Sequence, residues 1–129
     1  MNVSIPIGAH LVPPDKVESL NRHVLRRAHL LQTHVVSQHL GITRERTIAM
    51  LGLIAVKVSG QLVFLIYHDS CPEMADAFVE ERPAHEGLPS FPYVCPACER
   101  TITNEHALSY DIALRIPPET EVRIESPHG

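Results

Sequence analysis

The sequence predicts an α+β chain whose first half is rich in helices and whose second half is rich in strands. Apolar residues recur at helical intervals up to about residue 51, and short β-branched and aromatic segments follow from residue 54 onward. All three cysteines lie between residues 71 and 98. Residues 1–68 carry seven Lys and Arg against three Asp and Glu, whereas residues 69–129 carry four against twelve. These observations predict two small domains, 1–68 and 69–129, with opposite net charge.

The first predicted helix begins after Pro13 and Pro14. Asp15 can cap it, and Glu18 stands at the spacing of a capping box. Apolar residues then recur at helical intervals and predict one buried stripe: Val17, Leu20, Val24, Ala28 and Leu31. Arg22 and Arg26 share another face.

Two further helices are predicted around a glycine turn. One covers about residues 34–40 and ends at Gly41 as a left-handed cap. Thr43 caps the next, which carries Ile48, Met50 and Leu51. Residues 35–48 resemble a helix-turn-helix with Gly41 in the turn. In that family the helix after the turn enters the major groove, which implies that Arg44 and Arg46 face base edges.

A β-hairpin is predicted next, from residues 54–59 and 61–68, because both segments are rich in Val, Ile, Leu, Phe and Tyr and Ser59-Gly60 stands between them. Three helices followed by a hairpin is the order of a winged helix. The resemblance implies phosphate contacts from the wing and from the first helix, made by Lys57, Arg22, Arg26 and Arg27.

Two ligand pairs dominate the second half. His68 and Cys71 are separated by two residues, as are Cys95 and Cys98, and 23 residues lie between the pairs. A pair of this spacing followed by a second pair about 15 to 20 residues later is typical of zinc sites. Four protein ligands complete a tetrahedron and leave no open position, so the spacing predicts a structural Zn²⁺ rather than a catalytic one.

The fourth ligand has alternatives. His85 and His106 compete with His68, which is favoured by its regular offset from Cys71. If His68 does not bind, a site of three cysteines and a water becomes possible.

The rest of the second half fits a zinc ribbon. A proline-containing connection covers residues 72–92, a later strand is predicted at 110–116, and residues from 117 onward are expected to form a loose tail in which 122–124 can add an edge strand. A winged helix-turn-helix followed by a zinc ribbon resembles the transcription factor E group and various prokaryotic regulators, over roughly residues 15–116. The chain departs from a ribbon of four cysteines at His68.

Enzymatic interpretations fit poorly. Cys95-Pro96-Ala97-Cys98 resembles a thioredoxin-like redox motif, but only 31 residues follow it and no βαβ pattern surrounds it. The zinc deaminase signature requires His-x-Glu and Pro-Cys-x-x-Cys, whereas this chain has His85-Glu86 and Val94-Cys95. No Ser-His-Asp arrangement or phosphate-binding loop stands out. We expect a protein that is not an enzyme.

Two functions follow from the charge distribution. The basic half predicts a DNA-binding transcriptional regulator; the alternative is an adaptor in a larger complex, whose acidic half binds a protein through Glu80, Glu81 and Glu86. An exposed apolar patch would favour the adaptor; its candidate residues are Phe78, Leu88 and Phe91. The longest apolar runs, 48–56 and 62–67, are too short to cross a membrane, and reduced metal-bound cysteines predict a cytoplasmic protein.

Overall fold

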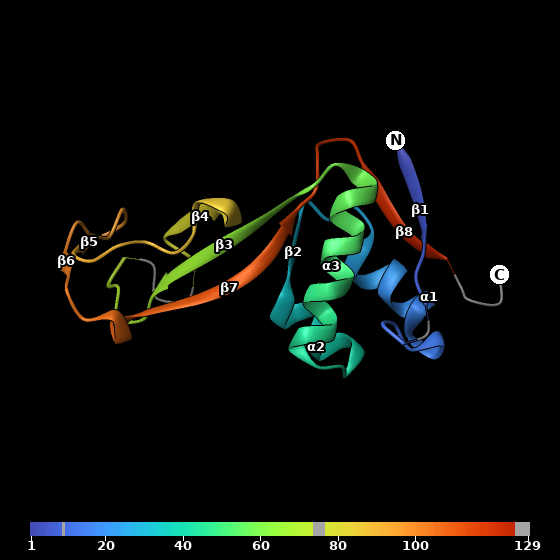
Figure 1. The fold of residues 1–129 in the computed structure, drawn as a ribbon, viewed down its shortest axis with the longest axis horizontal. Coiled ribbons are helices and arrows are strands. Elements are labelled where there is room, and N and C mark those ends of the chain that lie inside the picture. The colour runs from blue at the N-terminus through green and yellow to red at the C-terminus, as the bar shows by residue number, and fades with distance from the viewer. Residues whose placement is uncertain (9, 74–76, 126–129) are drawn as a thin grey trace. The chain divides into compact units, whose positions relative to one another are not determined.

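The chain folds into two units that mix helices and strands (Figure 1). The computed structural model describes residues 1–8, 10–73 and 77–125. Residues 1–62 and 113–129 form the first, here the helical unit, and residues 63–112 form the second, here the cysteine unit. The mixed composition confirms the expected α+β class. The division differs from the predicted boundary after residue 68, because the C-terminal strand returns to pair with the N-terminal one.

The first helical segment changes its winding along its length. A 3₁₀ turn covers Pro14–Lys16, α1 covers Val17–Leu20, and a π-helical turn covers Asn21–Leu25. No side chain caps either start, so the predicted role of Asp15 is wrong. The segment also ends earlier than predicted. Arg27 takes a left-handed φ of 58°, which turns the chain, and Leu31 therefore lies in strand β2 (Leu30–Gln32).

The two helices around Gly41 are confirmed. They are α2 (Thr33–Leu40) and α3 (Arg44–Val58), and Gly41 caps α2 with φ 66°, a left-handed conformation that costs glycine little. The Thr43 side chain caps α3 by accepting a hydrogen bond from the backbone N–H of Arg46 at 3.2 Å. The Ser37 hydroxyl donates to the carbonyl of Ile42 at 2.8 Å, and this second hydrogen bond further stabilises the turn.

The predicted strand at residues 54–59 is wrong, because α3 continues through Val58. Ile54 and Val58 are buried at the same four-residue spacing as Met50, so they extend its buried face instead of alternating as strand residues do. Ser59 ends the helix in a left-handed conformation. The strand over residues 61–68 is confirmed as β3 (Gln61–His68), but the hairpin of residues 54–68 does not form.

Strand β3 belongs to a four-stranded sheet in the order β2-β7-β3-β4. Its other members are β7 (Leu108–Arg115) and β4 (Glu80–Pro83). The predicted strand at 110–116 corresponds to β7. Leu31 of β2 pairs with Leu114 of β7, and Leu65 of β3 pairs with Glu81 of β4, both in antiparallel register.

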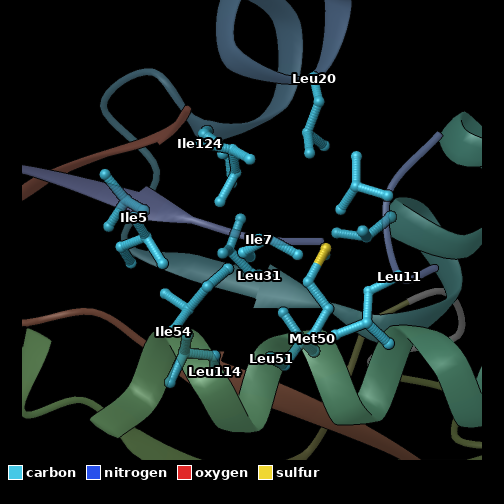
Figure 2. Packing of buried hydrophobic residues seen from close by; sticks show 14 of the residues in the cluster. Ile5, Ile7, Leu11, Leu20, Leu31, Met50, Leu51, Ile54, Leu114 and Ile124 are labelled. Carbon is cyan, nitrogen blue, oxygen red and sulfur yellow. The ribbon is translucent and has the colours of Figure 1, made fainter. Parts of the chain in front are cut away.

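The core of the helical unit gathers apolar side chains from α1, α2, α3 and the strands β1 (Asn2–Pro6), β2, β7 and β8 (Glu121–Glu125) (Figure 2). Figure 2 shows Met50 and Ile54 of α3 pointing toward Ile7 and Leu31, with Leu20 of α1 on the opposite side. Most of these side chains are fully buried. Helix α3 is therefore held by its buried face, which explains why its β-branched residues stay helical.

Residues 121–125 form strand β8, which pairs in parallel with β1 (Figure 1). The edge strand suggested at 122–124 is thus present, and residues 121–125 are not a loose tail, whereas residues 126–129 of the predicted tail lie outside the described residues. The side chain of Asn21 supports this strand. It donates to the carbonyl of Ile124 at 2.9 Å and accepts from the N–H of the same residue at 2.8 Å, as a neighbouring strand would.

Asn21→Ala is expected to lower the free energy of unfolding by about 2 kcal/mol, because it leaves one backbone donor and one acceptor of β8 unpaired. Urea unfolding followed by circular dichroism measures this change. Asn2→Ala, which removes an exposed amide from the adjacent strand, is expected to cost less than about 0.5 kcal/mol. Equal costs in the two variants would contradict the proposed role of Asn21.

Candidate metal centre

The cysteine unit brings four metal-binding side chains together: His68, Cys71, Cys95 and Cys98. Their ligand atoms all lie within 4.8 Å of one another. These are the four residues that the spacing predicted. His85 and His106, the competing histidines, lie in exposed 3₁₀ turns and are not members of the cluster.

The first ligand pair lies where β3 ends. His68 is the last residue of that strand, and the N–H of Cys71 donates to the His68 carbonyl at 3.0 Å, which closes a tight turn. Ser109 of β7 donates to the side chain of Asp69, and the N–H of Asp69 donates to the carbonyl of Ala107. These contacts tie the turn to Ser109 of β7 and to Ala107 just before that strand, and the ligand atoms of His68 and Cys71 lie in the same cluster.

The second pair lies in the turn of a small hairpin. Strands β5 (Tyr93–Val94) and β6 (Thr101–Ile102) pair in antiparallel register, and Cys95 follows β5 directly. The Cys95 carbonyl accepts from Glu99, and its N–H donates to Arg100. Glu99 takes a left-handed φ of 63°, which lets six residues reverse the chain and turn Cys98 back toward Cys95.

The distances fit a tetrahedral ion. Zinc–sulfur bonds of about 2.3 Å and zinc–nitrogen bonds of about 2.0 Å place sulfur atoms about 3.8 Å apart and sulfur and nitrogen about 3.6 Å apart. The Sγ atoms of Cys71 and Cys95 are 4.0 Å apart, and the Sγ of Cys98 lies 3.6 Å from Nδ1 of His68. These two opposite edges of the cluster therefore already have the size that zinc coordination requires.

Similarity to known proteins assigns no role to this cluster. No known protein family, curated protein or solved structure matches the chain. The donor set itself, three thiols and one imidazole, could hold a metal ion and suits zinc. Four protein ligands leave no position for water or substrate, so the chemistry fits a structural ion.

The ligands are also part of the apolar core of the cysteine unit. Cys71 and Cys95 are buried together with four apolar side chains: Ile66, Tyr93, Ile102 and Leu108. His68 is buried and Cys98 is partly exposed. A core of this size provides little hydrophobic stabilisation, so a bound ion would contribute much of the unit's stability.

A polar network next to the ligands was not evident from the sequence. The Tyr93 hydroxyl donates to Glu80 at 2.6 Å, and Arg82 also contacts the Glu80 carboxylate, at 3.1 Å. Burial, followed by this hydrogen bond to Glu80, raises the pKa of Tyr93. The network ties β5, which leads into Cys95, to β4. Sequence spacing could not reveal it, because Glu80 and Tyr93 are 13 residues apart, lie on strands of different sheets and meet only in the folded protein.

The surroundings of the Cys98 thiol raise its pKa. A backbone hydrogen bond with Arg100 lowers its pKa, but partial burial and the neighbouring thiols of Cys95 and Cys71 together raise the pKa above its usual value. A metal ion must displace that proton to bind the thiolate.

The residues predicted to contact nucleic acid are scattered. Arg44 is exposed in the first turn of α3, and Lys57 is exposed in its last turn, about 20 Å away along the helix, rather than in a wing. Arg46 is partly buried, and its Nε is buried with no hydrogen-bond partner among the described residues. Arg27 is exposed at the turn after the first helical segment.

Arg22 and Arg26 are brought together. With Arg123 of β8, which sequence spacing could not connect to them, they line a groove of about 760 Å³ in the helical unit. Glu18 and Glu121 line the same groove, and Glu18 lies 2.6 Å from Arg22. The acidic residues offset part of the positive charge, so the groove is only weakly basic.

None of the described helices is long and apolar enough to cross a membrane.

Proposed function

We propose that this chain is a non-enzymatic adaptor with winged-helix connectivity, in which an acidic unit stabilised by zinc binds a basic partner protein. The observation that carries the proposal is the charge of the cysteine unit. Residues 63–112 contain nine Asp and Glu and two Lys and Arg, a net charge of −7. Residues 1–62 and 113–129 contain six acidic and nine basic residues, a net charge of +3.

The order of the elements supports winged-helix connectivity. Helices α1, α2 and α3 are followed by β3 and β7, which are neighbours in one sheet. In this proposal the hairpin of the wing is β3–β7 instead of residues 54–68. Residues 69–107, which contain the three cysteine ligands, form the connection between its strands, and His68 ends β3. A wing that carries a strongly acidic insertion repels phosphates and attracts basic protein surfaces.

Exposed apolar side chains on the cysteine unit also favour a protein partner. Leu88, two residues from the exposed acid Glu86, is 51% exposed, and Val94 is 57% exposed. Phe78 and Phe91, the other candidates for an apolar patch, are partly buried. Glu80, expected among the contact residues, is bonded to Tyr93 and Arg82 and so has a structural role.

A fluorescent peptide of about 20 residues rich in Lys and Arg provides the test, with its Kd measured by anisotropy. Glu86→Lys with Glu105→Lys, both exposed on the cysteine unit, is expected to weaken binding about tenfold. Glu121→Lys with Glu125→Lys makes the same charge change on the helical unit and is expected to alter Kd less than about twofold. Equal weakening by both pairs would contradict a specific acidic surface.

DNA binding is the second candidate function, favoured by the exposed Arg44 in the first turn of α3 and by the groove with Arg22 and Arg26. The same anisotropy assay with a labelled DNA duplex distinguishes a DNA-binding regulator from an adaptor. Binding to DNA that falls steeply with salt and is lost in Arg44→Ala would favour the regulator. Preference for the basic peptide, with weak and salt-insensitive DNA binding, would favour the adaptor.

A further inference from the structure

Helix α3 presents an exposed ridge that the rest of the described chain does not cover. Glu45, Ala49, Leu53 and Lys57 recur every four residues, and all four are exposed. Residues four apart lie on one row along a helix surface, the row that packs into the groove of a neighbouring helix. Leu53 is 45% exposed at the middle of this row.

The ridge is complementary to itself. It begins with an acid, continues with a small and then a large apolar residue, and ends with a base. In an antiparallel second copy the order is reversed, so Lys57 of one copy faces Glu45 of the other and Leu53 of one faces Ala49 of the other. A two-fold axis repeats each of these pairs, so the interface contains every favourable contact twice.

We propose that α3 forms the interface of a symmetric homodimer in which two copies of this ridge pack antiparallel. The geometry of the helix suits close approach. Ala49 is small, and Gly52 lies beside the ridge with no atom within 4 Å of the position where a Cβ would stand. Small residues let two helix axes approach within about 8 Å, where Leu53 can fill the space above Ala49 of the second copy.

A second copy fits this surface better than DNA does. The centre of the ridge, Ala49 and Leu53, offers no side-chain hydrogen-bond donor or acceptor with which to contact base edges. Val56, 79% exposed next to the ridge, is likewise apolar. Charges of opposite sign at its two ends match an antiparallel copy, whereas a phosphate backbone would be repelled by Glu45. The dimer would cover the helix that a DNA-binding regulator needs.

The dimer is independent of the proposed adaptor function, because it uses the helical unit and requires no contact by the cysteine unit. Each can therefore fail alone. Loss of peptide binding with an intact dimer would overturn the adaptor, and a monomer that binds the basic peptide would overturn the dimer.

Sedimentation equilibrium of the full zinc-loaded chain, from about 1 to about 200 µM, tests the proposal. A dimer mass is expected within this range, and Leu53→Glu is expected to raise the dissociation constant at least about a hundredfold by placing two buried carboxylates at the interface. Glutamate is a good helix former and Leu53 is exposed, so the variant should still fold, which circular dichroism verifies. Leu88→Glu, at a similarly exposed leucine of the cysteine unit, is the matched control and should leave the dimer unchanged.

A charge exchange tests the antiparallel register. Glu45→Lys and Lys57→Glu, each alone, place like charges together at both ends and are expected to weaken the dimer about tenfold. The double variant restores opposite charges and is expected to return to within about threefold of the original affinity. A monomer at every concentration, a dimer insensitive to Leu53→Glu, or a double variant no better than the single ones would overturn the proposal.

Discussion

Removal of the metal, or replacement of Cys95 by serine, is expected to unfold the cysteine unit and to leave most of the helical unit folded. Structural zinc contributes about 10 kcal/mol or more in small domains, more than any single side chain. Two of the four ligands, Cys71 and Cys95, are buried in the small apolar core of the unit together with Ile66, Tyr93, Ile102 and Leu108, and Cys98 packs against it. Without the ion, three thiols and an imidazole would share a small core with too few apolar neighbours to keep it closed.

Native mass spectrometry and amide NMR spectra measure this effect together. One zinc per chain is expected in fresh protein, and a strong chelator is expected to collapse the signals of residues 68–112 into the range of unfolded peptides while most signals of residues 1–62 persist. His68→Ala should weaken zinc binding, whereas His85→Ala, which changes an exposed histidine outside the cluster, should not. Unchanged folding of residues 68–112 in the metal-free protein would defeat the structural role of the site.

The ligand cluster could be predicted because its information is local. Two residues between ligands require a tight turn, and that requirement is visible in the sequence as His68-x2-Cys71 and Cys95-x2-Cys98. Choosing His68 over His85 also followed from spacing alone. The network that supports the ligands could not be predicted in the same way, because Glu80 and Tyr93 lie on strands of two different sheets and meet only when the unit has folded.

Some elements of the fold could likewise be predicted from the local sequence, and others could not. Gly41 ends α2 with its own left-handed backbone, and the Thr43 side chain bonds to the backbone three residues later. The end of α2 and the start of α3 could therefore be predicted from the sequence. The helical conformation of residues 54–58 could not be predicted, because Ile and Val favour strands by local preference. Burial of Ile54 and Val58 against other elements keeps these residues helical, and the local sequence does not show which elements will pack there. The pairing of β1 with β8 joins the two ends of the chain and has no local signal.

Ile54→Ala is the second large expected effect and tests this explanation of α3. The Ile54 side chain has 0% exposure and lies in the core with Met50, Leu51 and Leu114 (Figure 2). Truncation to alanine removes buried apolar surface and leaves a cavity, which typically costs about 2 to 5 kcal/mol. Alanine is the better helix former, so any local preference would act in the opposite direction, by less than about 1 kcal/mol.

Chemical unfolding monitored by the helical circular dichroism signal gives the cost, with zinc saturating in all samples. Val35→Ala, at an exposed apolar residue of α2, is the matched control and should change the free energy of unfolding by less than about 0.5 kcal/mol. A large loss at Ile54 with no loss at Val35 means that burial on one face holds residues 54–58 in the helix. A stabilised Ile54→Ala would instead mean that intrinsic helix preference dominates there, and α3 would then need no core contact to extend to Val58.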